Sequence, residues 1–385
     1  MDLGALGIDR GGHLLVARAL QGLAPGDTVE VRGHDQHLGL HLAAWAREHG
    51  HRAEGMNITK GKASDARWNG AERAGVPGPT VWEKAPLRWG LAARGALVEA
   101  GGPDLSVADL DTKAAVWSDL APRLYAQAAA AQWDPATAID WTIAPRLPDD
   151  IEQAVVQVMT YLIENEQAAL MVPARFLGRI HPHYREVTQL LAIQAADEAR
   201  HIEVFTRRAL LVTRQLGVSG AGGRASLQSL LDETDFPIAS FLLSVLGEGT
   251  FLHLLSFLER HAPDAVTAQI CHLALQDEAR HVAFGLGHLE EQLQAEPELR
   301  PRLRQAMERR HDALASTSGL NDEVFDALVV LAAGGWTPEA IGRGHEAVQQ
   351  LQTDMDDGRR RRLTRLGFSP LEAAELSALH TRNFM

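Results

Sequence analysis

Cysteine is almost absent from the sequence, since Cys271 is the only one in 385 residues. A single cysteine excludes an internal disulfide framework and a rubredoxin-type iron centre held by four cysteine thiolates. It also suits a reducing compartment, so we predict a cytoplasmic protein. We interpret Cys271 itself as a small apolar residue of a helix.

Positive charge is also scarce. The sequence has 37 Lys and Arg residues against 50 Asp and Glu residues, which gives a net charge of -13. A protein that binds nucleic acid by neutralising phosphates needs the opposite balance, so we predict no nucleic-acid partner. The short basic run at residues 359–362 is interpreted as a solvated helix face, with a docking site for an acidic partner as the alternative.

Long apolar runs and targeting signals are not evident either. No stretch approaches the roughly 20 apolar residues that would span a bilayer. The N-terminus carries Asp2 and Asp9 and does not have the apolar core of a signal peptide. We therefore predict no membrane association.

Helical patterns dominate the rest of the sequence, and we predict a mainly α protein with four segments. Residues 1–57 form a small α/β domain, 58–145 a connecting segment rich in Trp, Gly and Pro, 146–315 a domain of four long helices, and 316–385 a C-terminal helical extension. The connecting segment contains one predicted helix, at about 107–132. Its tryptophans are expected to pack between elements rather than to line a substrate channel.

The N-terminal segment has a regular order of short elements. These are a helix at 14–23, a turn at Pro25-Gly26-Asp27, a strand at 28–31 and a helix at 38–49. This order resembles the small sulfur-carrier (sulfurtransferase) fold. The Cys-Pro pair that works in that family corresponds to Asp9 and Arg10 here, so the resemblance implies a scaffold without persulfide chemistry, which serves to dock a partner or to form an oligomer such as a homodimer.

Four long helices are predicted between Pro148 and Pro297, at 150–178, 183–217, 235–262 and 264–294. Gly217 is expected to end the second helix, and Pro237 lies in the first turn of the third. Lengths of this order with intermediate connections are typical of a four-helix bundle. In the C-terminal extension, Thr337-Pro338 and Ser369-Pro370 predict two further helix starts.

The pentapeptide Asp-Glu-Ala-Arg-His occurs twice, at residues 197–201 and 277–281. Glu and His at i and i+3 share one face of a helix, and Asp and His at i and i+4 lie close to the same line. Each copy therefore presents Glu and His together on one side, as Glu198 with His201 and Glu278 with His281. One such pair alone is more often a coincidence on an exposed face, but two identical copies on separate long helices favour a metal site.

The other two predicted helices each offer a buried carboxylate. Glu166 has only apolar residues at i±3 and i±4, whereas Glu164 has more polar neighbours, so we choose Glu166 for the first helix. The third helix offers Glu248 in its middle, and burying it alone would be costly unless it meets a cation or a proton. Gly247 and Gly249 flank Glu248, either to leave space beside the metals or to let helices pack closely.

Four carboxylates and two imidazoles make a donor set that suits two iron ions, with manganese or a mixed Mn/Fe pair as alternatives. The predicted ligands, through which catalysis would occur, are Glu166, Glu198, His201, Glu248, Glu278 and His281. We expect Asp197 and Asp277 to accept the free ring N–H of the ligating histidines. Arg200 and Arg280 are then expected to hold these two aspartates.

On these motifs, residues 150–296 resemble the ferritin-like superfamily of di-iron carboxylate proteins, whose inward-facing ligand set has two Glu-x-x-His helices. The resemblance is to its oxygen-activating branch, which includes ribonucleotide reductase small subunits, multicomponent monooxygenase hydroxylases and arylamine N-oxygenases. Phe205 replaces the radical tyrosine of the reductase subunits. Ala274 replaces an additional histidine ligand of the N-oxygenases, so neither of these two chemistries is supported.

The resemblance implies a non-haem di-iron oxygenase or oxidase that uses O2 as co-substrate to hydroxylate, N-oxygenate or otherwise oxidise a small organic molecule. No nucleotide-binding Gly-x-Gly-x-x-Gly follows a predicted strand, so we expect an external electron donor such as a reductase or a ferredoxin. The main alternative is a protein that handles metal or peroxide, as in rubrerythrin-like peroxidases, manganese catalases or iron storage. A third hypothesis is a non-catalytic scaffold whose metals serve only stability.

Overall fold

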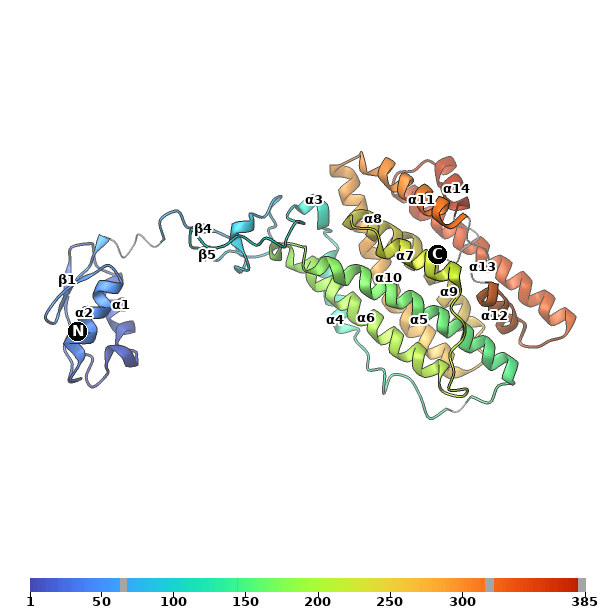
Figure 1. Ribbon diagram of the computed structural model, residues 1–385, viewed down its shortest axis with the longest axis horizontal. Coiled ribbons are helices and arrows are strands. Elements are labelled where there is room, and N and C mark those ends of the chain that lie inside the picture. Colours follow the sequence, from blue (N-terminus) through green and yellow to red (C-terminus); the bar gives the residue numbers. More distant parts are fainter. Residues whose placement is uncertain (63–67, 144, 316–321, 380–385) are drawn as a thin grey trace. The chain divides into compact units, whose positions relative to one another are not determined.

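The computed structural model describes residues 1–62, 68–143, 145–315 and 322–379. The chain divides into two compact units. The first unit comprises Met1–Thr80 and Arg88–Asp104, and the second comprises Val81–Leu87 and Leu105–Met385. The protein is mainly helical with a small N-terminal β region, as predicted (Figure 1).

The first unit places two helices against a small sheet. The helices are α1 (Gly12–Gln21) and α2 (Leu38–Glu48), and the strands are β1 (Thr28–Glu30), β2 (Arg52–Glu54) and β3 (Asn57–Thr59). The strands are antiparallel in the order β1-β3-β2, and a separate pair joins β4 (Glu72–Arg73) to β5 (Leu97–Val98). Val16, Leu42 and Ile58 are fully buried between the layers. The predicted helices and strand are present, and the likeness to the sulfur-carrier fold stays a prediction.

The second unit is built around a four-helix bundle (Figure 1). Its members are α5 (Asp149–Leu177), α6 (Arg185–Ala209), a third helix made of α8 (Phe236–Ser240), η5 (Phe241–Glu248) and α9 (Gly249–Arg260), and α10 (Ala265–Ala295). α5 packs along α6, and α10 packs against α9, η5 and α6. Their apolar faces form one continuous core that includes Leu162, Phe205, Leu254 and Ile270. The predicted bundle is therefore confirmed.

The third helix changes its winding in the middle, which its sequence did not predict. Asp235 caps the start by accepting a hydrogen bond from the Ile238 amide. The central part, η5, is a π-helix that ends at Glu248. Short π-helical turns lower the regularity of a helix and occur often at functional sites. Its Val245 carbonyl accepts a hydrogen bond from Arg362 Nε at 2.7 Å.

The same helix is long and apolar enough to cross a membrane by length and composition. Its most apolar stretch, within Phe236–Arg260, is 83% buried inside the protein. A second candidate, Asp322–Ala333 with Pro338–Arg365, is bent by 117°. The buried third helix of a bundle has this composition because neighbouring helices cover it on every side.

Two predicted helix limits are wrong. α6 ends at Ala209 rather than at Gly217, because the chain turns back onto α5, where the Gly217 amide donates to the Thr160 hydroxyl at 2.8 Å. A further helix, α7 (Ala221–Leu231), then follows. The helix predicted at 107–132 is divided into α3 (Lys113–Val116) and α4 (Ala121–Ala130), because Trp117 adopts extended backbone between them.

Four helices complete the second unit: α11 (Leu299–Ala315), α12 (Asp322–Ala333), α13 (Pro338–Arg365) and α14 (Pro370–Ala378). Thr337 and Ser369 cap α13 and α14, as predicted. The interpretation of the basic run as a solvated face is wrong for two of its members. Arg359 and Arg362 are buried, and Arg359 donates to Ser377, because α13 turns this face toward its neighbours.

Candidate metal centre

The bundle brings all six predicted ligand residues to one place. Glu166 comes from α5, Glu198 and His201 from α6, Glu248 from the end of η5, and Glu278 and His281 from α10. All six are at most 4% exposed. Glu164, the alternative on α5, is half-buried and is not part of this cluster.

The six side chains form two overlapping groups, each of which could hold one ion. One group is Glu166, Glu198, His201 and Glu278, and the other is Glu198, Glu248, Glu278 and His281. Within each group, one possible ligand atom per residue lies within 4.8 Å of all the others. Glu198 and Glu278 belong to both groups, as carboxylates that bridge two ions would.

Both histidines direct Nδ1 toward the carboxylates. His201 Nδ1 lies 3.3 Å from Glu198 Oε2 and 3.4 Å from Glu166 Oε2. His281 Nδ1 lies 3.0 Å from Glu198 Oε1 and 3.4 Å from Glu278 Oε2. In both cases Nδ1 is therefore the nitrogen available to an ion.

Several of these buried atoms make no hydrogen bond of normal geometry among the residues that the structure describes, although His281 Nδ1 and Glu198 Oε1 lie only 3.0 Å apart. They are Glu166 Oε1, Glu198 Oε1, Glu248 Oε2, Glu278 Oε2 and His281 Nδ1. Burying a charged oxygen without a partner is costly, and clustering four carboxylates adds mutual repulsion. Two divalent cations would satisfy these atoms and offset the charge, so the residues fit a di-metal site.

The electrostatics of the cluster without metal favour bound protons. Burial raises the pKa of Glu166 and of Glu248 well above the usual range, and neighbouring carboxylates raise both further. Burial acts to lower the pKa of His201 and of His281, but the surrounding carboxylates outweigh it and raise both. Metal ions would therefore compete with protons for the same atoms.

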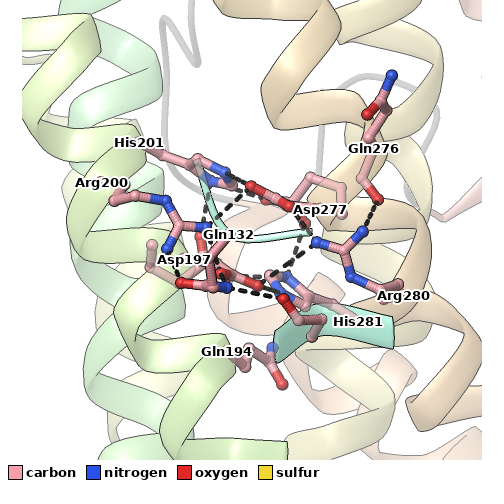
Figure 2. A network of polar contacts seen from close by, with 12 residues as sticks. Gln132, Gln194, Asp197, Arg200, His201, Gln276, Asp277, Arg280 and His281 are labelled. Carbon is pink, nitrogen blue, oxygen red and sulfur yellow. Dashed lines mark hydrogen bonds and ion pairs between the residues drawn. The ribbon is translucent and has the colours of Figure 1, made fainter. Parts of the chain in front are cut away.

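The two motifs are interlocked through their aspartates (Figure 2). His201 Nε2 lies 3.2 Å from Asp277 Oδ2, and His281 Nε2 lies 3.2 Å from Asp197 Oδ2. Each aspartate thus accepts from the histidine of the other motif. The sequence predicted that the aspartates would receive the ring N–H groups, but it could not show this exchange between α6 and α10.

Two arginines and Gln132, which follows α4, hold the aspartates in turn (Figure 2). Arg200 pairs with Asp197, and Arg280 pairs with Asp277. Gln132 Nε2 donates to Asp197 Oδ1 at 3.0 Å, and Trp133 Nε1 donates to Asp277 Oδ2 at 2.8 Å. Burial alone would raise the pKa of Asp277. The hydrogen bond with His201, together with Trp133 and Arg280, instead lowers this pKa to about 2.

The sequence does not predict this role for Gln132 and Trp133. The sequence predicts packing for Trp133, as for the other tryptophans. Its ring does stack on Arg200, whose guanidinium carbon lies 5.0 Å from the ring centroid. Its indole N–H also fixes Asp277, as described above. No local pattern distinguishes it, because the contact joins residues 144 positions apart.

The helix order and the ligand set together define the family type. Two Glu-x-x-His helices alternate with two helices that each add one Glu, and all six side chains point into the bundle. The second unit therefore has a ferritin-like arrangement of helices with a candidate di-metal carboxylate site.

Comparison with known proteins finds similarity at the level of solved structures. No family model and no curated protein matches the chain. An R2-like ligand-binding oxidase from Sulfolobus acidocaldarius is 16% identical with a TM-score of 0.44, over 66% of this chain and 94% of that one. A Synechococcus protein with aldehyde deformylating oxidase activity is 18% identical with a TM-score of 0.43, over 60% and 96%.

A variant R2-like ligand-binding oxidase with an anaerobically reconstituted Mn/Fe cofactor is 16% identical with a TM-score of 0.46, over 66% of this chain and 95% of that one. In each case the alignment covers nearly all of the other protein.

A cavity lies beside the metal ligands. Its lining includes three of the candidate ligands, Glu166, Glu248 and Glu278, together with Asn165, Ala169, Leu227, Leu230, Leu243, Gly247 and Phe251. About 20 Å³ of it admits the centre of a water-sized molecule, which is room enough for O2. Gln194, which does not line the cavity, donates to Glu248 Oε1 at 3.0 Å and fixes its orientation.

The two glycines beside Glu248 have different surroundings. Gly247 lines the cavity, and a Cβ added to it would meet only the Leu242 carbonyl, at 3.5 Å. A Cβ on Gly249 would lie 2.4 Å from Arg362 Nε. Gly247 therefore borders the cavity beside the candidate ligands, and close helix packing explains Gly249.

Proposed function

We propose that the second unit binds two iron ions and reduces O2 while it oxidises a small organic molecule. The observation that carries this proposal is the pair of overlapping groups, in which four buried carboxylates and two imidazoles converge with unsatisfied atoms. Manganese, or a mixed Mn/Fe pair, suits the same oxygen and nitrogen donors. Catalysis would pass through Glu166, Glu198, His201, Glu248, Glu278 and His281 as metal ligands.

Two redox-active ions, when bound, would supply the electrons that O2 reduction requires. The chain's own contribution is to hold donors in place before the ions arrive. Asp277 and Asp197 keep the proton of each ring on Nε2, which leaves Nδ1 free to bind. The apolar wall of the cavity excludes bulk water from the reacting side. An external donor, such as a reductase or a ferredoxin, is part of the proposal.

Anaerobic titration with Fe(II) tests the binding part of this proposal. The wild-type protein should bind two irons per chain, because there are two groups of ligands. Glu166→Ala should lose tight binding at one of them. Glu164→Ala is the matched control on the same helix and should still bind two, since Glu164 lies outside the cluster.

Exposure of the loaded protein to O2 tests the chemistry. We expect uptake close to one O2 per two irons, with a transient visible absorption band that Glu166→Ala abolishes. Iron uptake far beyond two per chain would favour storage instead. Rapid O2 evolution from hydrogen peroxide by the manganese-loaded protein would favour a catalase, and either result would overturn the proposal.

A further inference from the structure

Glu248 differs from the other three candidate carboxylate ligands in what holds its side chain. Glu166, Glu198 and Glu278 each have an oxygen within 3.4 Å of His201 Nδ1. Neither of the candidate histidine ligands forms an ion pair with Glu248 in the described part of the chain. The orientation of Glu248 therefore depends on another group.

Gln194 on α6 is that group. Its Nε2 donates to Glu248 Oε1 at 3.0 Å, and the two residues are 2% and 4% exposed. Because both side chains are buried, this hydrogen bond acts in a low dielectric, where it is stronger than in water. The Ser244 hydroxyl also lies near Glu248 and acts against the rise in its pKa that burial causes, but Gln194 supplies the hydrogen bond of normal geometry.

The hydrogen bond from Gln194 uses only one oxygen of Glu248. A carboxylate accepts hydrogen bonds and does not donate them, so the amide must turn its nitrogen toward Oε1. Oε2 makes no hydrogen bond of normal geometry with any residue that the structure describes. Glu248 belongs to only one of the two overlapping groups of candidate ligands, the group that includes His281. Gln194 therefore contacts a carboxylate that serves one ion position and not the other.

The backbone places both residues for this contact. Gln194 lies about one turn before Glu198 on α6, so it shares the helix face that points into the bundle. Glu248 ends η5, in which the Val245 carbonyl accepts a hydrogen bond from Arg362 Nε on α13. The backbone of η5 and the carboxylate of Glu248 are thus held by separate contacts, one from α13 and one from α6.

We propose that Gln194 is a positioning residue for one of the two ions, because it fixes Glu248 with Oε2 as the atom that is offered to the metal. The other ion position has Glu166 in place of Glu248. Gln194 should therefore strengthen binding at the first position and not at the second. Partners that orient a ligand in this way contribute about 10–100-fold to metal affinity. This inference rests on the binding of two ions in the proposed function.

Anaerobic calorimetric titration of the metal-free, full-length protein with Fe(II) tests this in variants that keep one ion position. Glu166→Ala keeps the position that contains Glu248, and adding Gln194→Leu should weaken binding there by about 10–100-fold. Glu248→Ala keeps the other position. There Gln194→Leu should change the affinity by less than about twofold, because the carboxylate that it orients is already gone.

Two further variants support the comparison. Gln189→Leu changes an exposed glutamine of the same helix and should leave the affinity of both positions unchanged. Leucine at position 194 should be tolerated, since a small, mainly apolar cavity borders this side chain. If Gln194→Leu nevertheless fails to fold, Gln194→Met, which keeps an unbranched chain without a donor, should give the same selective loss.

The outcomes separate this inference from the proposed function. Equal weakening at both positions would indicate a general structural role for Gln194, and unchanged affinity at the position that contains Glu248 would show that the amide does not orient it. Either result would overturn the inference while two ions still bind to the wild type. A wild type that does not bind two ions would contradict both proposals. A failure of O2 reduction would contradict only the proposed function, because the titration uses no O2.

Discussion

His201 Nε2 lies 3.2 Å from Asp277 Oδ2, although the two residues belong to different copies of the same pentapeptide. The reciprocal contact joins His281 to Asp197. Each copy therefore supplies two ligand side chains to the cluster and also orients the histidine of the other copy. This makes α6 and α10 dependent on one another at the site, so a change in one motif should affect the ligand carried by the other.

Replacement of Asp277 by Asn should weaken metal binding by about 10–100-fold. The Asp277 oxygens accept from Arg280, Trp133 and His201, and an amide would direct N–H groups at some of these donors. Isothermal titration with Fe(II) measures the loss, and Asp312→Asn, an exposed residue of α11, is the control.

A double-mutant cycle on the metal-free protein tests the exchange between motifs. Asp277→Asn should couple more strongly to His201→Ala, its direct partner, than to His281→Ala in the free energy of unfolding. The reverse pattern would show that each aspartate serves its own motif.

Trp133→Phe should lower metal affinity by removing one donor to Asp277 while keeping an aromatic ring over Arg200. A hydrogen bond to a charged acceptor contributes about 1.5–3 kcal/mol, so the free energy of unfolding should also fall. Trp141→Phe is a matched control, since Trp141 donates to the Pro135 carbonyl and stacks under Arg207. It should lower stability without changing metal affinity, and an equal loss of metal in both variants would contradict the role of Trp133.

The sequence carried much of the information about the bundle because its signals are periodic and local. Apolar neighbours at i±3 and i±4 distinguish Glu166 from Glu164, and the structure places only Glu166 in the cluster. The caps at Asp235, Thr337 and Ser369 are local as well, since a side chain there binds an amide three residues away.

Features that depend on contacts between distant residues could not be predicted in this way. The π-helix before Glu248 has a carbonyl held by Arg362, 117 positions further on. α6 ends early because residues near 217 bind α5, and not because of a stop signal. Arg359 and Arg362 are buried by the packing of α13, whereas charge patterns alone favour exposure.

The metal-free protein should become less stable as pH rises above about 6.5. The pKa values of His201 and His281 are raised above 6.5, and those of Glu166 and Glu248 above 4.5, so the folded state holds protons that the unfolded chain releases. The stabilisation that these four side chains contribute is fully present below their pKa values in the unfolded chain. It is lost as pH rises through their pKa values in the folded protein. Asp277, with a pKa lowered to about 2, acts oppositely but only in acid.

Metal binding should reverse this dependence. Ions displace the same protons, so Fe(II) uptake should release protons in an unbuffered titration, and apparent affinity should increase with pH. Thermal melts of metal-free and metal-loaded protein between about pH 6 and pH 8 provide the comparison. A metal-free melting temperature that rises over this interval would contradict the raised pKa values.

Gly247→Ala and Gly249→Ala should have opposite effects, although the glycines are only two residues apart. A methyl on Gly249 would collide with Arg362, which is buried and bonded to the Val245 carbonyl, so it cannot move aside freely. We expect a loss of about 1–3 kcal/mol in the free energy of unfolding, as for other overpacked sites.

A methyl on Gly247 has an ordinary contact with Leu242 and otherwise extends into the cavity. Alanine has a better helix propensity than glycine, so the free energy of unfolding should equal that of wild type or exceed it by up to about 1 kcal/mol. The same methyl should slow O2 uptake by the iron-loaded protein, because it occupies space beside the candidate metal ligands. Urea denaturation and O2 uptake by the iron-loaded protein measure the two effects on each variant. Equal destabilisation by both substitutions would show that the space beside Glu248 is not what requires glycine at 247.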